Sequence, residues 1–213
     1  MFPLHDSITA TKTPLFTWGI IAANIGIFLL ELSRGETFIA KYALIPSRVD
    51  FLQLSSFTPF ISSMFLHGGW FHLLSNMWFL KIFGDNVEAR FGKLKFFLFY
   101  LFAGVIAALV QFIAAPSSQI PMIGASGAIA GVLGAYFVFF RHAKITSIVP
   151  LFFYITVIDI PAAFYLPYWF LLQVFSGVGQ VVSGSLATTG GIAFLAHAGG
   201  FVAGYAVAKY AKR

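Results

Sequence analysis

The sequence contains no cysteine and few charged residues. The absence of cysteine excludes disulfide bonds, thiolate catalysis and cysteine-ligated zinc, and it leaves hydroxyl and imidazole groups as candidate reactive groups. Charged residues make up 9% of the 213 residues, against about 25% in an ordinary soluble domain, whereas hydrophobic residues make up 59%. This composition is typical of a chain whose main surroundings are lipid.

Long apolar segments predict a helical protein with several membrane spans. A membrane helix needs about 20 mostly apolar residues, so this chain has room for five or six spans joined by short loops. We expect one all-α membrane domain over residues 1–213, an integral membrane protein without a separate soluble domain. The six predicted spans cover residues 15–32, 67–86, 94–115, 121–140, 161–178 and 191–208.

Three segments need separate interpretation. The first apolar stretch is not followed by a small-residue cleavage site, so we interpret it as an uncleaved first span. Residues 33–66 contain charged residues together with Pro46 and Pro59, and they predict a long connection with interfacial helices. Residues 144–160 are rich in β-branched and aromatic residues, and we interpret them as an interfacial loop that dips into lipid.

The distribution of basic residues predicts the orientation of the bundle. If the N-terminus lies inside, only Arg34, Lys41 and Arg48 of the 13 Lys and Arg residues lie outside. Cytoplasmic ends carry the excess of basic residues, so both termini are predicted to be cytoplasmic. The net charge of +6 then reflects membrane topology. Because the basic residues form no clustered patch, we expect no nucleic-acid partner.

Four polar residues lie near the starts of the second, fourth and sixth spans. These are His72, Asn76, Ser126 and His197. With the predicted topology, all three spans begin at the outer face, so these residues share one depth. Polar side chains at such depth are costly against lipid and should face the bundle interior or a water-filled cavity. We therefore expect them to converge.

Small residues favour close contact between the fourth and sixth spans, because glycine lets helix backbones approach each other in lipid. The glycines on these spans are Gly124, Gly127, Gly131, Gly134, Gly199, Gly200 and Gly204. Ser126 and His197 lie at the outer ends of these two glycine-lined faces. A serine hydroxyl becomes a nucleophile when a base lies within hydrogen-bond reach, and His197 is the candidate base.

Donors for a tetrahedral intermediate are also available. His72 and Asn76 are four residues apart and share one helix face. Both side chains can donate a hydrogen bond to a developing oxyanion, and the backbone N–H of Ser126 is a third candidate donor.

Each of these residues also has a structural interpretation. Ser126 can bond back to its own helix, His197 can be a buried neutral histidine, and His72 with Asn76 can form an interhelical hydrogen-bond pair. Their shared depth favours a functional site.

Other residues that attract notice have simpler interpretations. The tryptophans Trp70, Trp78 and Trp169 are interpreted as span or belt residues, and His67 as structural. No HExxH motif and no acidic cluster within the spans is present, which disfavours metalloproteases and aspartyl proteases. We expect no metal and no cofactor.

Three sequence segments, in this order, resemble the rhomboid intramembrane serine proteases. They are HGGWFHLLSNMWFLKIFGDNVEARFG at 67–92, GASGAIAGVLGAY at 124–136 and AHAGGFVAGY at 196–205. The resemblance extends from about residue 17 to 208. A lone GxSG would be weak, but three motifs on alternate spans are specific.

The resemblance implies a role for each polar residue. Ser126 would be the nucleophile and His197 the general base, with His72 and Asn76 as oxyanion donors. The implied substrates are other membrane proteins, cut in or beside a transmembrane segment within the lipid bilayer, and the implied location is the bacterial cytoplasmic membrane.

The same resemblance marks further positions. Glu88 and Arg90 match a cytoplasmic-side pair that is expected to be structural. Some relatives carry an aromatic residue four positions after the nucleophile that packs against the base, but here that residue is Ala130.

Two other functions stay open on the sequence alone. A pseudoprotease of the same type would bind membrane clients without cutting them, although such proteins typically lack the serine or the histidine. A small transporter would show internal repeats, and none is found.

Overall fold

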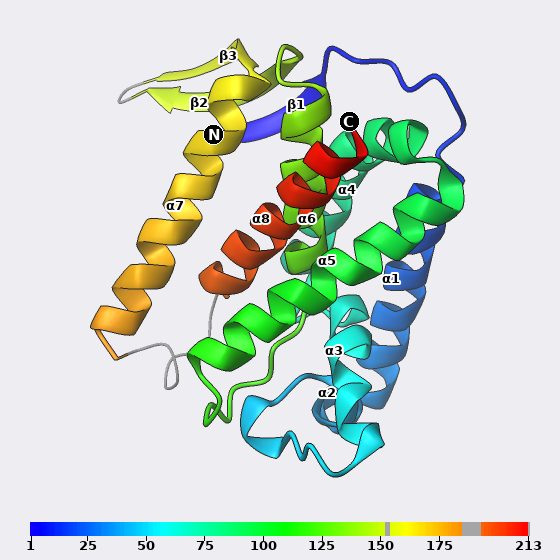
Figure 1. The fold of residues 1–213 in the computed structure, drawn as a ribbon, viewed down its shortest axis with the longest axis vertical. Helices are drawn as coiled ribbons and strands as arrows, with labels where there is room; N and C mark the ends of the chain where they lie inside the picture. Colours follow the sequence, from blue (N-terminus) through cyan, green and yellow to red (C-terminus); the bar gives the residue numbers. More distant parts are fainter. Residues whose placement is uncertain (152–153, 185–192, 213) are drawn as a thin grey trace.

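The computed structural model describes residues 1–151, 154–184 and 193–212. Six long helices form a bundle, with α7 at its edge (Figure 1). They are α1 (Leu15–Arg34), α4 (Trp70–Phe91), α5 (Lys93–Ala114), α6 (Ser126–Phe139), α7 (Ala162–Val182) and α8 (Phe194–Ala211). Each predicted span overlaps one of these helices, with ends that differ by up to five residues. The predicted beginning of the last span, at residues 191 and 192, lies outside the described residues.

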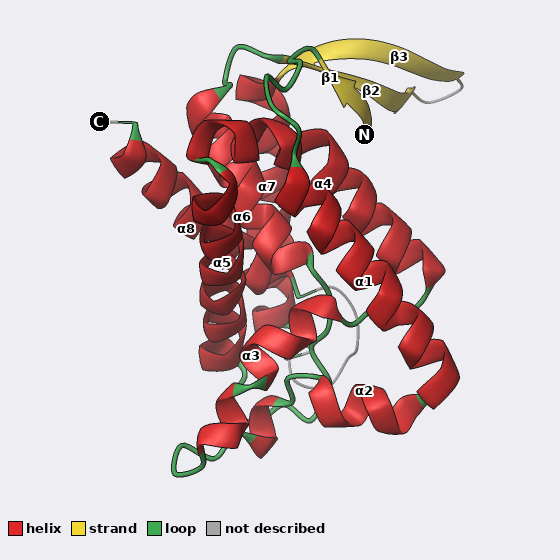
Figure 2. Ribbon diagram, turned by 90° about the vertical axis from the view of Figure 1, so that its right-hand side faces the viewer, coloured by secondary structure: helices red, strands yellow, loops and turns green. Residues whose placement is uncertain are grey.

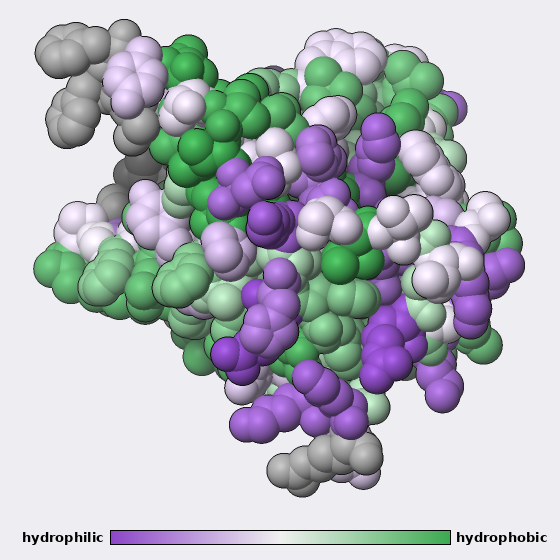
Figure 3. Space-filling model, turned by 90° about the horizontal axis from the view of Figure 1, so that it is seen from above, coloured by the Kyte–Doolittle hydropathy of each residue, from purple (hydrophilic) through white to green (hydrophobic). Residues whose placement is uncertain are grey.

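Three of the described helices are long and apolar enough to cross a membrane, namely α1, α5 and α7. Helix α6 is apolar but has only 14 residues, and the second half of α4 contains several charged residues. The six-span count and the orientation of the bundle therefore remain predictions. Both termini lie at one end of the bundle (Figure 1), and hydrophilic residues gather on that end (Figure 3), as an orientation with both termini cytoplasmic would require.

The prediction of an all-α fold was wrong, because a three-stranded antiparallel sheet lies across one end of the bundle (Figure 2). Its strands follow the order β1 (Phe2–Asp6), β2 (Lys144–Leu151) and β3 (Tyr154–Pro161). β-branched residues favour strands, and here β2 and β3 pair as a hairpin, with Ile148 opposite Val157. Strand β1 then pairs with β2 from the far end of the sequence.

The hairpin of β2 and β3 presents apolar side chains outward. Tyr154, Ile155 and Val157 are 64%, 74% and 56% exposed. Clustered apolar exposure of this kind marks contact with a membrane or another protein. The hairpin leads directly into the start of α7, at the end of the bundle that is predicted to be cytoplasmic. We therefore predict that it lies in the boundary between lipid headgroups and acyl chains.

A nitroxide label on an Ile155→Cys variant tests this location, and the label has a single attachment site because the chain has no other cysteine. In liposomes the label should be relaxed more by lipid-soluble oxygen than by a water-soluble nickel complex. A Lys12→Cys variant, labelled in an exposed loop of the same end, should show the opposite preference. Equal behaviour of the two labels would place the hairpin in water.

The predicted interfacial helices of residues 33–66 are present as short elements. Helix α2 (Glu36–Tyr42) is followed by two 3-10 turns, then by helix α3 (Pro59–Ser62) and a third 3-10 turn. Within this connection Leu44 forms an antiparallel bridge with Met122, just before α6. Residues 121–124 are thereby kept out of a helix, so α6 begins at Ser126 and not at the predicted residue 121.

Glycines set the distance between α6 and α8. A Cβ atom on Gly200 would overlap the carbonyl oxygen of Gly127, and one on Gly204 would overlap that of Gly131. On the opposing helix, a Cβ atom on Gly134 would overlap the carbonyl oxygen of Phe201. The two helices thus cross with backbone against backbone, as the small-residue pattern predicted.

Strand β1 is attached to the helices by polar contacts. The carboxylate of Asp6 accepts hydrogen bonds from the hydroxyl of Tyr136 on α6 and from the side-chain amide of Asn86 on α4. The indole N–H of Trp78 donates to the carbonyl of Pro3 at 2.7 Å. Burial raises the pKa of the Asp6 carboxyl above its usual value. The sheet is therefore attached to both α4 and α6.

Glu88 and Arg90 make separate contacts. The buried carboxylate of Glu88 accepts hydrogen bonds from the backbone N–H groups of Phe16 and Thr17, at 3.0 and 2.7 Å, and from the hydroxyl of Thr17. These bonds satisfy donors at the start of α1. The guanidinium of Arg90 lies 5.4 Å from the centre of the Phe139 ring. Both contacts join neighbouring helices, which agrees with the structural role expected of the pair.

Candidate active site

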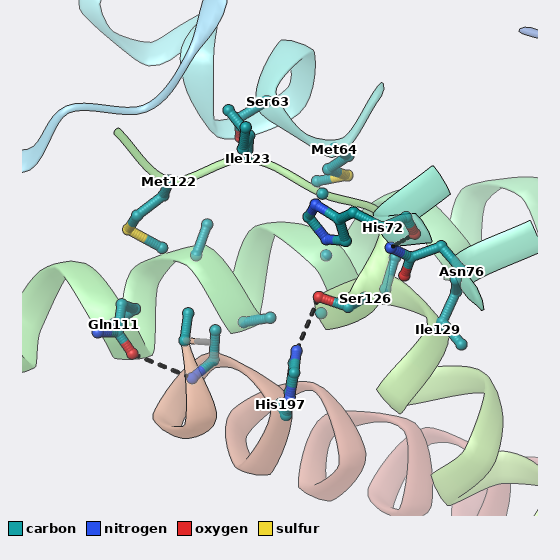
Figure 4. A pocket seen from close by; sticks show the side chains of 18 of the residues that line it. Ser63, Met64, His72, Asn76, Gln111, Met122, Ile123, Ser126, Ile129 and His197 are labelled. Carbon is teal, nitrogen blue, oxygen red and sulfur yellow. Dashed lines mark hydrogen bonds between the residues drawn. The ribbon is translucent and has the colours of Figure 1, made fainter. Parts of the chain in front are cut away.

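A cavity of about 750 Å³ opens among α4, α5, α6, α7 and α8. All four predicted site residues, His72, Asn76, Ser126 and His197, line it (Figure 4). Each lies in the first two turns of its helix, so the expected convergence is present. Ser126 is the first residue of α6 and therefore lies nearer the helix end than predicted.

Ser126 and His197 are in direct contact. The Nε2 atom of His197 lies 2.7 Å from the Oγ atom of Ser126, within the range of a strong hydrogen bond. The histidine is 8% exposed, and Ser126 is half-buried at the cavity wall. The backbone contact of α6 with α8 is what lets two such short side chains meet. This pair has the geometry of an activated serine nucleophile.

The second ring nitrogen of His197 contacts a residue that the sequence did not single out. Its Nδ1 atom lies 2.8 Å from the Oε1 atom of Gln173 on α7. One turn earlier, the indole of Trp169 stacks on the imidazole, with 5.9 Å between ring centres and 30° between planes. Trp169 lies within the candidate span α7, as predicted, but its contact with the imidazole was not predicted. A polar amide within a largely apolar helix is the sequence signal that could have identified Gln173.

His72 and Asn76 lie across the cavity from His197. The amide nitrogen of Asn76 donates to the backbone carbonyl of His72 at 2.9 Å, one turn earlier in the same helix. The Nδ1 atom of His72 accepts from the N–H of Gly68 at 3.4 Å, which assigns the ring proton to Nε2. A Cβ atom on Gly124 would lie 2.8 Å from that Nε2 atom. The donor edge of His72 therefore faces the loop that leads into Ser126.

Gly124 is required by this geometry. Its φ angle of +121° is one that side-chain-bearing residues rarely adopt. Its N–H donates to the carbonyl of Ser63 at 2.9 Å, which ties the loop to the turn before α4. The absence of a side chain leaves room for the His72 ring. The glycine of the GASG segment thus serves both the backbone turn and the site.

Two further contacts frame the cavity. The buried His67 packs edge-on against His72, with 5.1 Å between ring centres, and its N–H donates to the carboxylate of Glu31 at 3.1 Å. These contacts agree with a structural role for His67. The side-chain oxygen of Gln111 on α5 accepts from the N–H of Ala196 at 3.3 Å and so orients the start of α8. The sequence analysis did not identify Gln111.

Across residues 1–151, 154–184 and 193–212, no three His, Asp or Glu side chains come together as a metal site. The expectation that the protein needs no metal or cofactor remains a prediction.

Known proteins share the sequence of this region. Rhomboid-like protein 11, chloroplastic, of Arabidopsis thaliana is 36% identical over 116 residues, which cover 53% of this chain and 38% of that protein. Rhomboid protein 1, mitochondrial, of Saccharomyces cerevisiae is 31% identical over 133 residues, 60% of this chain and 37% of that protein. Rhomboid protease GluP of Bacillus subtilis is 37% identical over 130 residues, 57% of this chain and 24% of that protein.

The matches thus cover less than two fifths of the length of each of these relatives. The family model for the Rhomboid domain matches residues 54–213, which include every predicted site residue and all of the cavity lining except Pro46. Together with the apolar helices, this match identifies an integral membrane protein, and the chain belongs to the rhomboid family.

Proposed function

We propose that this protein is an intramembrane serine endopeptidase in which Ser126 is the nucleophile and His197 the general base. The observation that carries the proposal is the 2.7 Å contact between Ser126 Oγ and His197 Nε2 at the wall of a cavity. A serine of purely structural role needs no histidine acceptor, because its hydroxyl can bond to a nearby backbone carbonyl. The name of the Bacillus subtilis relative, a rhomboid protease, agrees with this chemistry.

The contacts support an acyl-transfer mechanism. Ser126 Oγ attacks the scissile carbonyl carbon as its proton passes to His197 Nε2. The imidazolium then returns this proton to the leaving amine as the peptide C–N bond breaks. A water molecule, deprotonated by the same nitrogen, attacks the acyl-enzyme and releases the second product and free Ser126. The cavity supplies a path for that water from the predicted outer face.

The developing oxyanion would be stabilised from α4 and from the start of α6. The Nε2–H of His72 faces the loop before Ser126, and Asn76 keeps one amide hydrogen beyond its bond to the His72 carbonyl. Asn76 is buried at 6% exposure, where a hydrogen bond to an anion is stronger than in water. The backbone N–H of Ser126 itself is the third donor.

The substrates we propose are other membrane proteins, cut in or beside a transmembrane segment. The cavity wall is largely apolar, and His72, Asn76 and His197 line it together with Ser126. Helix α7 lies at the edge of the bundle (Figure 1), so a substrate segment that enters beside it would reach Ser126 from the lipid. The named relatives come from chloroplasts, mitochondria and a bacterium, so the bacterial cytoplasmic membrane remains a prediction.

Fluorophosphonate labelling tests the proposal without a known substrate. The purified protein in detergent should gain the mass of one adduct, since an activated serine attacks the phosphorus atom. Ser126→Ala and His197→Ala should abolish the adduct. Ser75→Ala is the matched control, because Ser75 lines the same cavity and bonds to the backbone carbonyl of His72 without a histidine base.

The opposite result is equally informative. A folded wild-type protein that gains no adduct and cuts no transmembrane reporter would contradict the protease proposal. The client-binding function of a pseudoprotease would then be favoured.

A further inference from the structure

We infer that Gln173 on α7 is the residue that positions the base. It completes a hydrogen-bonded chain of Ser126, His197 and Gln173 from three helices. The inference deepens the proposed function and rests on it. Its starting point is the contact of 2.8 Å between His197 Nδ1 and Gln173 Oε1. Neither the sequence motifs nor the known names of the relatives point to a residue on this helix.

The amide of Gln173 is oriented by its own helix. Its nitrogen donates to the backbone carbonyl of Trp169 at 3.5 Å, which leaves the oxygen facing His197. An amide oxygen can only accept, so the proton of a neutral imidazole is held on Nδ1. The lone pair of Nε2 is then directed at the hydroxyl of Ser126. The opposite tautomer would present a hydrogen to Ser126 and could not take its proton.

Trp169 holds the plane of the same ring. It lies four residues before Gln173, so both side chains project from one face of α7. Its indole stacks on the imidazole of His197 at 30°. On α6, the fully buried Ala130 offers only a methyl group one turn after the nucleophile. The aromatic side chain that packs against the His197 ring therefore comes from α7. It takes the place of an aromatic residue at position 130.

A neutral amide suits this position in lipid. A carboxylate would hold the same tautomer and would also stabilise the imidazolium, as in triads of soluble proteases, but an isolated charge at this depth is costly. Gln173 is 9% exposed and Trp169 is half-buried, so the contact is largely shielded from water. The glutamine thus fixes the tautomer without adding a buried charge.

The contact of Gln173 and Trp169 with His197 requires close packing of α7 on α8. A Cβ atom on Gly177, one turn after Gln173, would lie 2.7 Å from the Leu195 side chain. The absence of that atom lets α7 approach the start of α8, where His197 lies. If α7 moves away from α8, both Gln173 and Trp169 leave the imidazole together. The base is therefore correctly oriented only while α7 is packed in place.

Two substitutions of Gln173 separate positioning from packing. Gln173→Met keeps the length of the side chain and removes the strong acceptor, whereas Gln173→Glu keeps an acceptor oxygen. We expect Gln173→Met to lower kcat on a transmembrane reporter, and the rate of fluorophosphonate labelling, by about 100-fold. KM should stay unchanged, because Gln173 does not contact the substrate. Gln173→Glu should restore the rate to within about tenfold of wild type.

The pH profile supplies a readout that a packing role would not change. In Gln173→Glu the new carboxylate should favour the imidazolium of His197, so the acidic limb of the rate profile should move to higher pH. His72 is the other titratable side chain that lines this cavity in the described part of the chain. It is common to all variants, so a shift confined to Gln173→Glu is assigned to the new contact.

The matched control is Leu172→Met, which places methionine on the lipid-facing side of the same helix, where Leu172 is 44% exposed. It should label at the wild-type rate. If Gln173→Met also labels at that rate, or if Gln173→Glu restores nothing, the positioning inference is wrong. The proposed function would fail differently: the wild type would gain no adduct, or Ser126→Ala would still gain one.

Discussion

Gly204→Ala is expected to unfold the bundle or leave it without activity. The added Cβ atom would overlap the carbonyl oxygen of Gly131, a backbone atom that cannot turn aside as a flexible side chain would. Relief requires α8 to move away from α6, which loses buried contact along both helices and separates His197 from Ser126. Overpacking of this kind typically costs about 1 to 3 kcal/mol, and occasionally more. The melting temperature in detergent and the fluorophosphonate adduct report the two effects.

Gly26→Ala is the matched control for this substitution. Gly26 lies within α1, is exposed, and a Cβ atom added there would have no neighbour within 4 Å. Alanine is the better helix former by about 1 kcal/mol, so this variant should melt at or above the wild-type temperature and keep its adduct. A Gly204→Ala protein with the melting temperature and labelling rate of the wild type would show that α6 and α8 do not pack as described.

The helices and their close packing could be predicted because both depend on local pattern. Apolar runs of membrane length marked the positions of all six long helices, and repeated glycines marked the face where α6 meets α8. The start of α6 could not be predicted in this way. Residues 121–125 are as apolar as a helix would be, but the bridge of Met122 to Leu44 and the φ angle of Gly124 keep residues 121–124 out of the helix. Long-range pairing thus overrides local preference.

The strands were missed for the same reason. Residues 144–160 showed the β-branched composition of strands, yet a hairpin that is apolar on an exposed surface looks like a segment dipping into lipid. The strand β1 has no local signal at all. It exists because β2 offers an edge and because Asp6 finds Tyr136 and Asn86 on two helices. Only the tertiary structure brings these groups together.

Some residues of the candidate site could likewise be predicted from the sequence, and others could not. Ser126, His197, His72 and Asn76 were identified because each lies near the start of a predicted span, and span topology fixes depth. Gln173 lies in the middle of a span in sequence, and its depth says nothing about which helix face it occupies. The rotation of α7 about its axis, which turns Gln173 and Trp169 toward His197, is set by packing. An isolated sequence carries no signal for that rotation.

Asn76→Ala and His72→Ala are each expected to lower kcat by about 100- to 1000-fold, the cost of one oxyanion donor. Asn76→Asp should lower kcat to a similar extent. It keeps the shape of the side chain but loses both amide hydrogens. Stability should change little, since the amide of Asn76 bonds to the carbonyl of His72 within its own helix. The measurements are kcat and the melting temperature of each variant, and we expect only kcat to fall.

The alternative interpretation of His72 and Asn76, a structural hydrogen-bond pair, gives the opposite pattern. A structural pair would lower the melting temperature when either residue is replaced, and kcat only in proportion to the folded fraction. A double variant adds a second test. If both donors serve one oxyanion, their combined effect on kcat should depart from the sum of the single effects, because each donor compensates in part for the loss of the other. Additive losses in kcat with an unchanged melting temperature would instead show that the two residues contribute independently to the transition state.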